Sequence, residues 1–268
     1  MVNTLRPILK EMDIHTVIDH SGDVSLCEAD MAKMKNYLLH GFDNLISMQN
    51  SCEGKKAVVL AHGPSLLSLN KEDYTEHVKI TCNDFHKIEF LKDFTPDFWC
   101  AANSYEALKA PFKICVDNNI STVVTVPRKF EFLQLIEIAE REDKLNLISP
   151  WLWERQMLQA MVASKYGHSQ LYSHCNTVTN HMIAFALWLG CDSIDVTGFD
   201  MSYSKAREVT GKSHAGVDLP ADTSGFESQA QRNQMVADLE YLCKIASENG
   251  IVINNLSYKS NELPKILT

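Results

Sequence analysis

The sequence predicts an α/β protein with a Rossmann-like, doubly wound and mainly parallel sheet. Two observations lead to this prediction. From Lys56 onward, short β-branched apolar runs alternate with longer segments of helical periodicity. The first of these runs ends in a small polar turn, which is typical of the carboxyl end of a parallel strand. Strands that alternate with helices in this way usually form a sheet covered on both faces.

The individual elements follow from apolar spacing and from the residues that interrupt it. Pro127 and Pro150 are expected to stop the fourth and fifth strands, and Gly190 is expected to end the most apolar helix. The strands are predicted at 57–61, 78–82, 97–102, 122–126, 145–148, 193–197 and 251–256, and helices at 130–142, 151–166, 178–189 and 229–249.

Two segments lie outside this alternation. Residues 1–54 read as an N-terminal helical extension, because Met34, Leu38 and Phe42 recur at helical spacing. This extension is expected to pack on the sheet or on a second subunit, which would make a homo-oligomer. Residues 55–268 form the expected nucleotide-binding catalytic domain, and the polar stretch at about 201–228 within it is predicted to be a lid.

Composition excludes several classes of protein. The 268 residues carry a net charge of −9, which disfavours a general nucleic-acid binder. The eight cysteines form no Cys-x-x-Cys pair, so no zinc site is expected and a reducing cytoplasm fits best. No apolar run approaches the roughly 20 residues of a membrane span, and the first ten residues lack the apolar core of a secretory signal.

The turn after the first strand is the strongest candidate for a binding site. His62, Gly63, Pro64 and Ser65 follow the run that ends at Ala61. A strand followed by a glycine turn leaves backbone N–H groups exposed, and these groups can bind an anion. Glycine also lets another group approach the backbone closely. An ordinary βα turn explains the same residues equally well.

Polar residues also follow the other predicted strands. Since the carboxyl ends of parallel strands meet at one edge of the sheet, these side chains are expected to share a crevice. Asparagine amides offer a donor and an acceptor together, which suits a ribose hydroxyl or a base edge. The residues concerned are Asn83 and Asp84, Asn103 and Ser104, and Gly198, Asp200 and Tyr203.

Two further features suggest chemistry. The polar run that contains Thr177 and Thr179 leads into the most apolar helix, where it can cap the helix and present N–H groups to a phosphate. Plain capping accounts for the same residues. His214 lies in the predicted lid, where a histidine could enter the closed site as a general base. A solvated loop histidine is the alternative.

Several of these motifs together resemble two related groups of proteins. One is the bacterial CMP-sialic acid-dependent sialyltransferases of glycosyltransferase family 42. The other is the DUF115 group, which includes the MptE-like 6-hydroxymethylpterin diphosphokinases and the Maf flagellin glycosyltransferases. The resemblance extends from Lys56 to about Leu256. It is carried by Gly63-Pro64-Ser65-Leu66, Cys82-Asn83-Asp84-Phe85, Asn103-Ser104, the Ala-rich stretch from Ala184 to Leu189-Gly190, Gly198-Phe199-Asp200, and Lys212-Ser213-His214.

The resemblance implies a glycosyltransferase that moves a sugar from a CMP- or other nucleotide-activated donor to the hydroxyl of a glycan or small-molecule acceptor. The reaction would be inverting and would need no metal or other cofactor. His214 would deprotonate the acceptor, and Tyr203 would stabilise the departing phosphate. The implied nucleotide-binding residues are His62, Gly63, Pro64, Ser65, Asn83, Asp84, Asn103, Ser104, Thr177, Thr179, Gly198 and Asp200.

The chain departs from the sialyltransferase pattern at identifiable places. His62 stands where those enzymes usually have Asn, and the Arg-x-x-Ser-Gly stretch before the Ala-rich helix is missing. The DUF115 diphosphokinases tend to have Asp where this chain has Asn83 and Asn103, which argues against a site for magnesium-bound nucleotide.

Two alternatives stay open. An MptE-like diphosphokinase would use ATP and Mg²⁺, with Asp84 and Asp200 as metal ligands. The other alternative is a nucleotide-binding module that has kept the fold but lost the catalytic chemistry.

Overall fold

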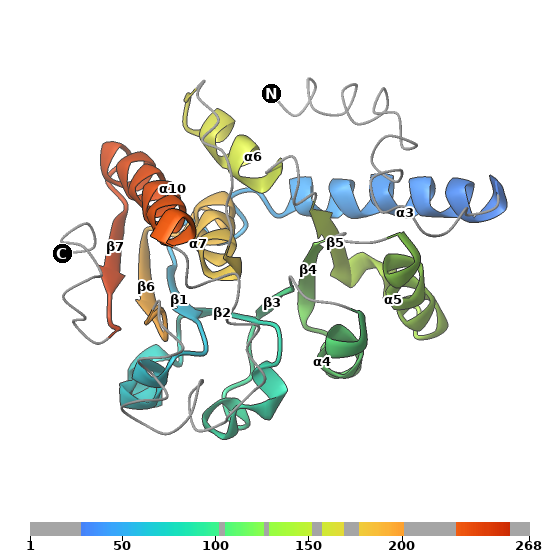
Figure 1. Cartoon of the computed structure of the whole chain (residues 1–268), viewed down its shortest axis with the longest axis horizontal. Helices are drawn as coiled ribbons and strands as arrows, with labels where there is room; N and C mark the ends of the chain where they lie inside the picture. Colours follow the sequence, from blue (N-terminus) through green and yellow to red (C-terminus); the bar gives the residue numbers. More distant parts are fainter. Residues whose placement is uncertain are drawn as a thin grey trace.

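The computed structural model describes residues 28–101, 105–125, 129–151, 157–168, 177–200 and 229–257. These residues form one seven-stranded sheet in the order β5-β4-β3-β2-β1-β6-β7, and every strand pair is parallel (Figure 1). The predicted α/β, doubly wound fold is therefore confirmed. The strands are β1 (Lys56–Leu60), β2 (Val78–Cys82), β3 (Phe98–Ala101), β4 (Ser121–Thr125), β5 (Ile148–Trp151), β6 (Ser193–Thr197) and β7 (Val252–Asn255).

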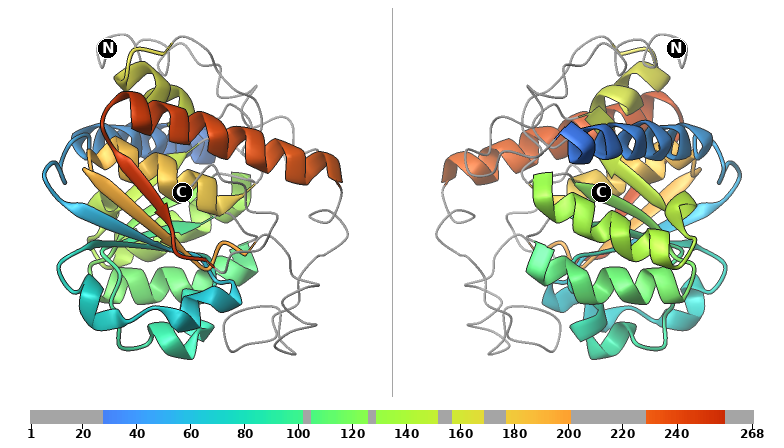
Figure 2. Two further views of the ribbon diagram at one scale, coloured as in Figure 1. Left: turned by 90° about the vertical axis from the view of Figure 1, so that its left-hand side faces the viewer. Right: turned by 90° about the vertical axis from the view of Figure 1, so that its right-hand side faces the viewer.

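Helices cover both faces of the sheet. Figure 2 shows α7 and α10, together with α3 and α6, above the sheet and α4 below it. The connections from β1 to β2 and from β2 to β3 contain only short 3-10 segments. The helices are α3 (Glu28–Ser47), α4 (Tyr105–Asp117), α5 (Lys129–Arg141), α6 (Met157–Lys165), α7 (Val178–Leu189) and α10 (Gln229–Glu248).

Helix α7 is the centre of the core. Every residue from Thr179 to Leu189 is buried, because the helix packs on β1, β2 and β3 on one side and on α6 and α10 on others. Its uniform apolarity, which hides any amphipathic pattern, is the expected signature of such a helix. Gly190 ends it with a φ of +82°, a left-handed conformation that favours glycine, as the sequence predicted.

Helix α3 packs on the sheet at the β5 side. Its residues Leu38, Phe42 and Leu45 are buried. The Asn44 amide donates to the carbonyl of Ile148 at 3.0 Å, and the Trp188 indole N–H donates to the carbonyl of Leu45 at 2.7 Å. Part of the helical extension thus belongs to the same core as the sheet.

The predicted bounds of the fifth strand were wrong. Residues 145–147 form a 3-10 turn, and the strand runs over Ile148–Trp151 with Pro150 inside it. Proline was expected to stop the strand because it has no N–H for the ladder. However, among the described residues β5 is the edge strand and pairs only with β4, so one side of Pro150 needs no partner there. Since β5 extends through Trp151, the helix predicted from 151 cannot begin there; α6 starts at Met157.

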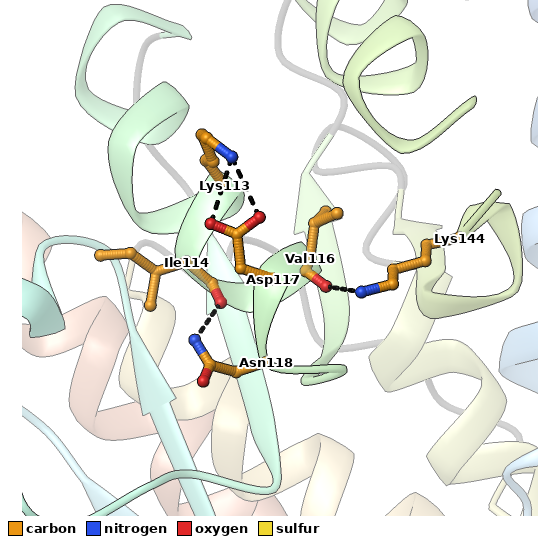
Figure 3. Close-up of polar contacts among 6 residues, drawn as sticks. All are labelled: Lys113, Ile114, Val116, Asp117, Asn118 and Lys144. Atoms are coloured by element: carbon orange, nitrogen blue, oxygen red, sulfur yellow. Dashed lines mark hydrogen bonds and ion pairs between the residues drawn. The ribbon is translucent and has the colours of Figure 1, made fainter. Parts of the chain in front are cut away.

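Helix α4 was not predicted. Pro111 lies inside it and removes one backbone donor, although Leu108, Phe112 and Cys115 are buried at helical spacing. Figure 3 shows how its end is capped: the Asn118 amide donates to the carbonyl of Ile114 at 2.8 Å, and Lys144 Nζ donates to the carbonyl of Val116 at 2.5 Å. These groups satisfy carbonyls that a helix leaves without partners at its last turn.

Candidate functional site

The order of the strands defines where a ligand would bind. From β1 the chain moves outward through β2 to β5, and it then returns to place β6 on the other side of β1. The boundary between β1 and β6 is therefore the topological switch point, and ligands of open α/β sheets bind at the carboxyl ends of the strands beside it. Gly63, Ser65, Gly198 and Asp200, all predicted site residues, lie there.

The two chain segments that leave the sheet at this point stay in contact. The Gly63 N–H donates to the carbonyl of Gly198 at 2.7 Å. A Cβ atom on Gly63 would lie 2.2 Å from Asp200 Oδ2, and one on Gly198 would lie 2.0 Å from the carbonyl oxygen of Ala61. Gly198 also has a φ of +72°. Both glycines are thus required by the close approach of protein groups.

Ser65 and Asp200 connect the same two segments through their side chains. The Ser65 N–H donates to Asp200 Oδ2 at 2.9 Å, and the Gly198 N–H donates to Ser65 Oγ at 3.0 Å. Pro64 occupies the first position of a short 3-10 segment, Pro64–Ser68. The N-cap residue of this segment is Gly63, which has no side chain that could cap it. The distant Asp200 carboxylate supplies the missing acceptor instead.

His62 lies at the carboxyl end of β1 and is only 8% exposed. Its Nε2 lies 3.4 Å from Thr81 Oγ1 of β2. The Thr81 hydroxyl also lies 3.3 Å from the carbonyl of Leu60, to which it can donate its proton. The adjacent Cys82 thiol is buried, which raises its pKa and leaves it neutral beside the imidazole.

Asn83 and Asp84 follow β2 at the same edge. Asn83 has a φ of +36°, its N–H donates to the carbonyl of Cys100 at 3.1 Å, and its carbonyl accepts from the Trp99 indole at 2.9 Å. These bonds fix the backbone where β2 ends. Asp84 forms an ion pair with Lys87 at 2.8 Å. Burial lowers the pKa of the neighbouring His86, so this imidazole is neutral at pH 7.

The N-terminus of α7 faces the same edge of the sheet. The helix precedes β6 and packs on β1, β2 and β3, so it runs back along the strands from their carboxyl ends. Thr177 is its N-cap, and the Thr177 hydroxyl accepts from the Thr179 N–H at 3.3 Å. The positive end of the helix dipole is therefore at the candidate site, where it would stabilise an anion.

The structure brings together most of the predicted nucleotide-binding residues, with the strand ends and the start of α7 at one edge of the sheet. Asn103, Ser104, Tyr203 and His214 lie outside the described residues, as does the predicted lid. Sequence reasoning missed Thr81, which contacts His62, and Ser257, whose hydroxyl accepts from the Phe199 N–H at 2.9 Å. Because 58 residues separate Ser257 from Phe199, no local pattern could have found this contact.

Among the described residues, no cluster of three or more His, Cys, Asp or Glu side chains could hold a metal ion. Within the same part of the chain, no helix combines the length and apolarity needed to cross a bilayer.

The order of the strands and the close approach of Gly63 and Gly198 at the switch point define an α/β protein of the Rossmann-like, doubly wound class. No protein-family model matches the chain, and no curated protein sequence matches it.

Comparison with solved structures finds sialyltransferases. The sialyltransferase CstII from Campylobacter jejuni, in complex with the substrate analogue cytidine-5′-monophosphate, is 17% identical, with 81% of this chain and 88% of that chain covered and a TM-score of 0.49. The same enzyme with a trisaccharide acceptor and CMP is 14% identical, with 80% and 88% covered and a TM-score of 0.48. The resemblance to the DUF115 group is not confirmed by these comparisons and stays a prediction.

Proposed function

We propose that this protein is a glycosyltransferase that transfers a sugar from a CMP- or other nucleotide-activated donor to a hydroxyl acceptor. The reaction is inverting and metal-independent, and it takes place in the cytoplasm. The observation that carries the proposal is the convergence of His62, Asn83 and the N-terminus of α7 at the carboxyl edge beside the β1–β6 switch point. This convergence supports a nucleotide site, while the order of the motifs along the chain supports sugar transfer.

The groups at this edge suit a nucleotide. Asn83 is half-buried and offers a donor and an acceptor to a base edge or a ribose hydroxyl. The His62 imidazole lies with Nε2 3.4 Å from the Thr81 hydroxyl, and an imidazole can both donate and accept a hydrogen bond. The capped start of α7 provides backbone N–H groups and a dipole for the phosphate. Gly63, Pro64, Ser65 and Gly198 shape the backbone beneath the nucleotide.

The chemistry follows from this arrangement. The acceptor oxygen attacks the anomeric carbon from the face opposite the leaving nucleotide, so the configuration inverts. His214 takes the acceptor proton as general base, and the Tyr203 hydroxyl donates a hydrogen bond to the departing phosphate. The α7 dipole stabilises the same developing charge, which is the task a metal ion performs in other transferases. Closure of residues 201–228 would exclude water and suppress hydrolysis of the donor.

The contacts of two carboxylates disfavour the diphosphokinase alternative. Asp200 already accepts from the Ser65 N–H, and Asp84 is already paired with Lys87. Recruiting Asp200 to Mg²⁺ would compete with its bond to the Ser65 backbone, and recruiting Asp84 would compete with its ion pair to Lys87. A hard divalent ion prefers carboxylates that are available for coordination.

The first test is thermal stabilisation by CMP, CDP, UDP, GDP and ATP, each with and without Mg²⁺. A nucleotide at about 100 times its dissociation constant adds about 2.7 kcal/mol to the free energy of unfolding. We expect a metal-independent shift with CMP. A shift that requires both ATP and Mg²⁺ would contradict the proposal in favour of a diphosphokinase, and no shift with any nucleotide would contradict both.

The second test is an assay of sugar transfer from a CMP-sugar, in which the release of CMP is measured. We expect His214→Ala to lose activity by 10²-fold or more, because a general base contributes about that much. His40→Ala removes an exposed histidine on α3 and serves as the matched control. Equal activity of the two variants would contradict the assignment of His214.

A further inference from the structure

The two edges of the sheet differ in how their backbone groups are protected. At one edge, β5 contains Pro150, and α3 packs on this strand. The Asn44 amide of α3 also donates to the carbonyl of Ile148 in β5 at 3.0 Å. A proline, a charged residue or a covering helix keeps an edge strand from pairing with another chain. At the opposite edge lies β7 (Figure 1), and Val252–Asn255 contain neither a proline nor a charged residue.

The hydrogen bonds to β6 determine which backbone groups of β7 point outward. The Leu256 N–H donates to the carbonyl of Val196 at 2.7 Å, and Val196 is the register partner of Asn255. In a parallel ladder, alternate residues of a strand direct N–H and C=O toward the same neighbour. Leu256 and the residues two and four positions before it therefore bond to β6, whereas the backbone groups of Ile253 and Asn255 point away from the sheet. Among the described residues, β7 pairs with β6 alone.

Two apolar side chains on one face of this strand are exposed to solvent. Val252 is 55% exposed and Leu256 is 37% exposed, and they are two of the three large hydrophobic side chains that are exposed in the described part of the chain. Because side chains alternate along a strand, both lie on the same face as Asn254. The Asn254 amide donates to Asp195 of β6 at 2.7 Å. Apolar side chains beside an unpaired strand edge favour association with another chain.

We propose that β7 pairs with β7 of a second copy of this chain, in an antiparallel arrangement about a twofold axis at Asn254. This interface is independent of the proposed transferase activity. A twofold axis brings one surface against itself, so the edge must be self-complementary. In this register Ile253 lies opposite Asn255 of the second copy, and the two residues exchange both N–H to C=O hydrogen bonds. By symmetry the exchange occurs twice, and it uses the outward groups of both residues.

The same register brings the exposed apolar side chains together. Val252 lies opposite Leu256 of the second copy, and Leu256 lies opposite that copy's Val252. These are pairs without mutual hydrogen bonds, in which the side chains come closest. A slide of two residues in either direction would place Val252 or Leu256 opposite Asn254 instead, and a slide of one residue would misalign the hydrogen-bonding groups. The apolar pairs therefore select this register.

The size of the contact predicts a weak dimer. Residues 252–256 of each copy take part, whereas stable interfaces usually involve roughly 20–30 residues a side. The strand edge is uncharged although the chain carries a net charge of −9, so no like charges face each other across the paired strands. We therefore expect monomer and dimer to exchange at micromolar concentrations.

Sedimentation velocity of the full-length protein, from about 5 to 500 µM, measures the association. We expect a concentration-dependent dimer. Val252→Lys should weaken dimerisation by at least about 10-fold, because symmetry places two ammonium groups in the apolar pairs. Leu67→Lys, at a side chain that is 48% exposed, is the matched control and should dimerise as the wild type does. Equal weakening by both substitutions would overturn the proposal. A monomer at every concentration would also overturn it, and would leave an extended segment of another protein as the occupant.

The double variant Val252→Lys/Leu256→Glu tests the register. Within one copy the two positions are roughly 13 Å apart, too far for an ion pair. Between copies each new ammonium would lie opposite a new carboxylate, and such cross-strand pairs are stabilising. We expect this variant to dimerise at least about 10-fold more tightly than Val252→Lys/Leu256→Lys, in which like charges are opposed. Equal dimerisation of the two double variants would contradict the pairing of Val252 with Leu256.

An engineered cysteine tests the position of the axis. Asn254 lies opposite Asn254 of the second copy, within the reach of a disulfide, so Asn254→Cys should form a reducible covalent dimer on mild oxidation. Val252→Cys is the control, since the two symmetric positions lie roughly 13 Å apart along the strands. Mass spectrometry of the digested protein identifies the linked peptides. Absence of the link in Asn254→Cys, or an equally fast link through Val252→Cys, would overturn the proposed pairing.

Discussion

Asp200 Oδ2 accepts a hydrogen bond from the backbone N–H of Ser65, and the two residues are 135 positions apart. This bond joins the segments that follow β1 and β6 at the point where the direction of strand addition reverses. It caps the first turn after β1 with a side chain from another strand. The candidate site is thus built by contacts between strand ends that lie far apart in the sequence.

Removal of the Asp200 carboxylate should destabilise the fold. In Asp200→Ala the Ser65 N–H loses its acceptor, and an unpaired buried donor costs about 1–3 kcal/mol. Urea unfolding measures this loss. Asp117→Ala removes a surface carboxylate that pairs with Lys113, and it should cost much less because exposed ion pairs contribute little to stability. Equal losses in the two variants would contradict the capping role.

Gly198→Ala should be much more harmful than Gly54→Ala. Both glycines have a positive φ, at +72° and +81°, so each substitution incurs about 1–2 kcal/mol of backbone strain. A Cβ on Gly198 would also lie 2.0 Å from a backbone oxygen, whereas a Cβ on Gly54 meets nothing within 4 Å. We expect Gly198→Ala to lose at least 3 kcal/mol more, measured by chemical unfolding, or to fail to fold. Similar midpoints for the two variants would be inconsistent with the close approach to Ala61.

Asp238 should make stability depend on pH. It lies in the buried face of α10 and is 2% exposed, and burial raises its pKa to about 7. Between the ordinary pKa of 3.8 and about 7 the folded state holds a proton that the unfolded state releases. The contribution of this group therefore becomes unfavourable as pH rises through this window, and it is constant above it.

The uncharged variant Asp238→Asn removes this contribution. We expect it to be more stable than the wild type at pH 8, by up to about 4 kcal/mol, with the difference shrinking toward pH 4. Unfolding curves across this range check the prediction. A constant difference between Asp238→Asn and the wild type at all pH values would refute the linkage.

Thr177→Ala should weaken both the fold and nucleotide binding. The Thr177 hydroxyl caps α7, and loss of an N-cap costs about 1 kcal/mol. Thr177→Ser keeps the hydroxyl and should restore stability. If the phosphate binds at this helix end, Thr177→Ala should also weaken CMP binding, measured by calorimetry, whereas Thr177→Ser should not. Unchanged stability in Thr177→Ala would show that the cap is unimportant.

Particular elements show how far the sequence could predict the fold. Strand β2 was predicted at its observed bounds, because Val78 and Ile80 are buried β-branched residues that end at a polar turn. Helix α4 was missed because Pro111 is locally unfavourable in a helix, yet packing of Phe112 and Cys115 outweighs that cost. The bounds predicted for β5 were wrong because a strand tolerates Pro150 only at the edge of a sheet. The local sequence does not reveal which strand lies at the edge.

The candidate site divides in a similar way. The glycine turn after β1 and the capped start of α7 were visible as local patterns, because strand ends and helix caps use characteristic residues. The partners of these residues were not visible. Thr81 meets His62 from the neighbouring strand, and Ser257 meets Phe199 from the far side of β7.

The sequence by itself determined the α/β class, the alternation of elements and the residues that end the strands, because these depend on apolar periodicity and on local turn chemistry. Only the tertiary structure decided that Gly63 and Gly198 pack against each other and that Asp200 caps the turn of Ser65. These contacts join segments more than 100 residues apart. Their pairing is fixed by strand order and register, which arise from the packing of the whole sheet and not from any local stretch of the chain.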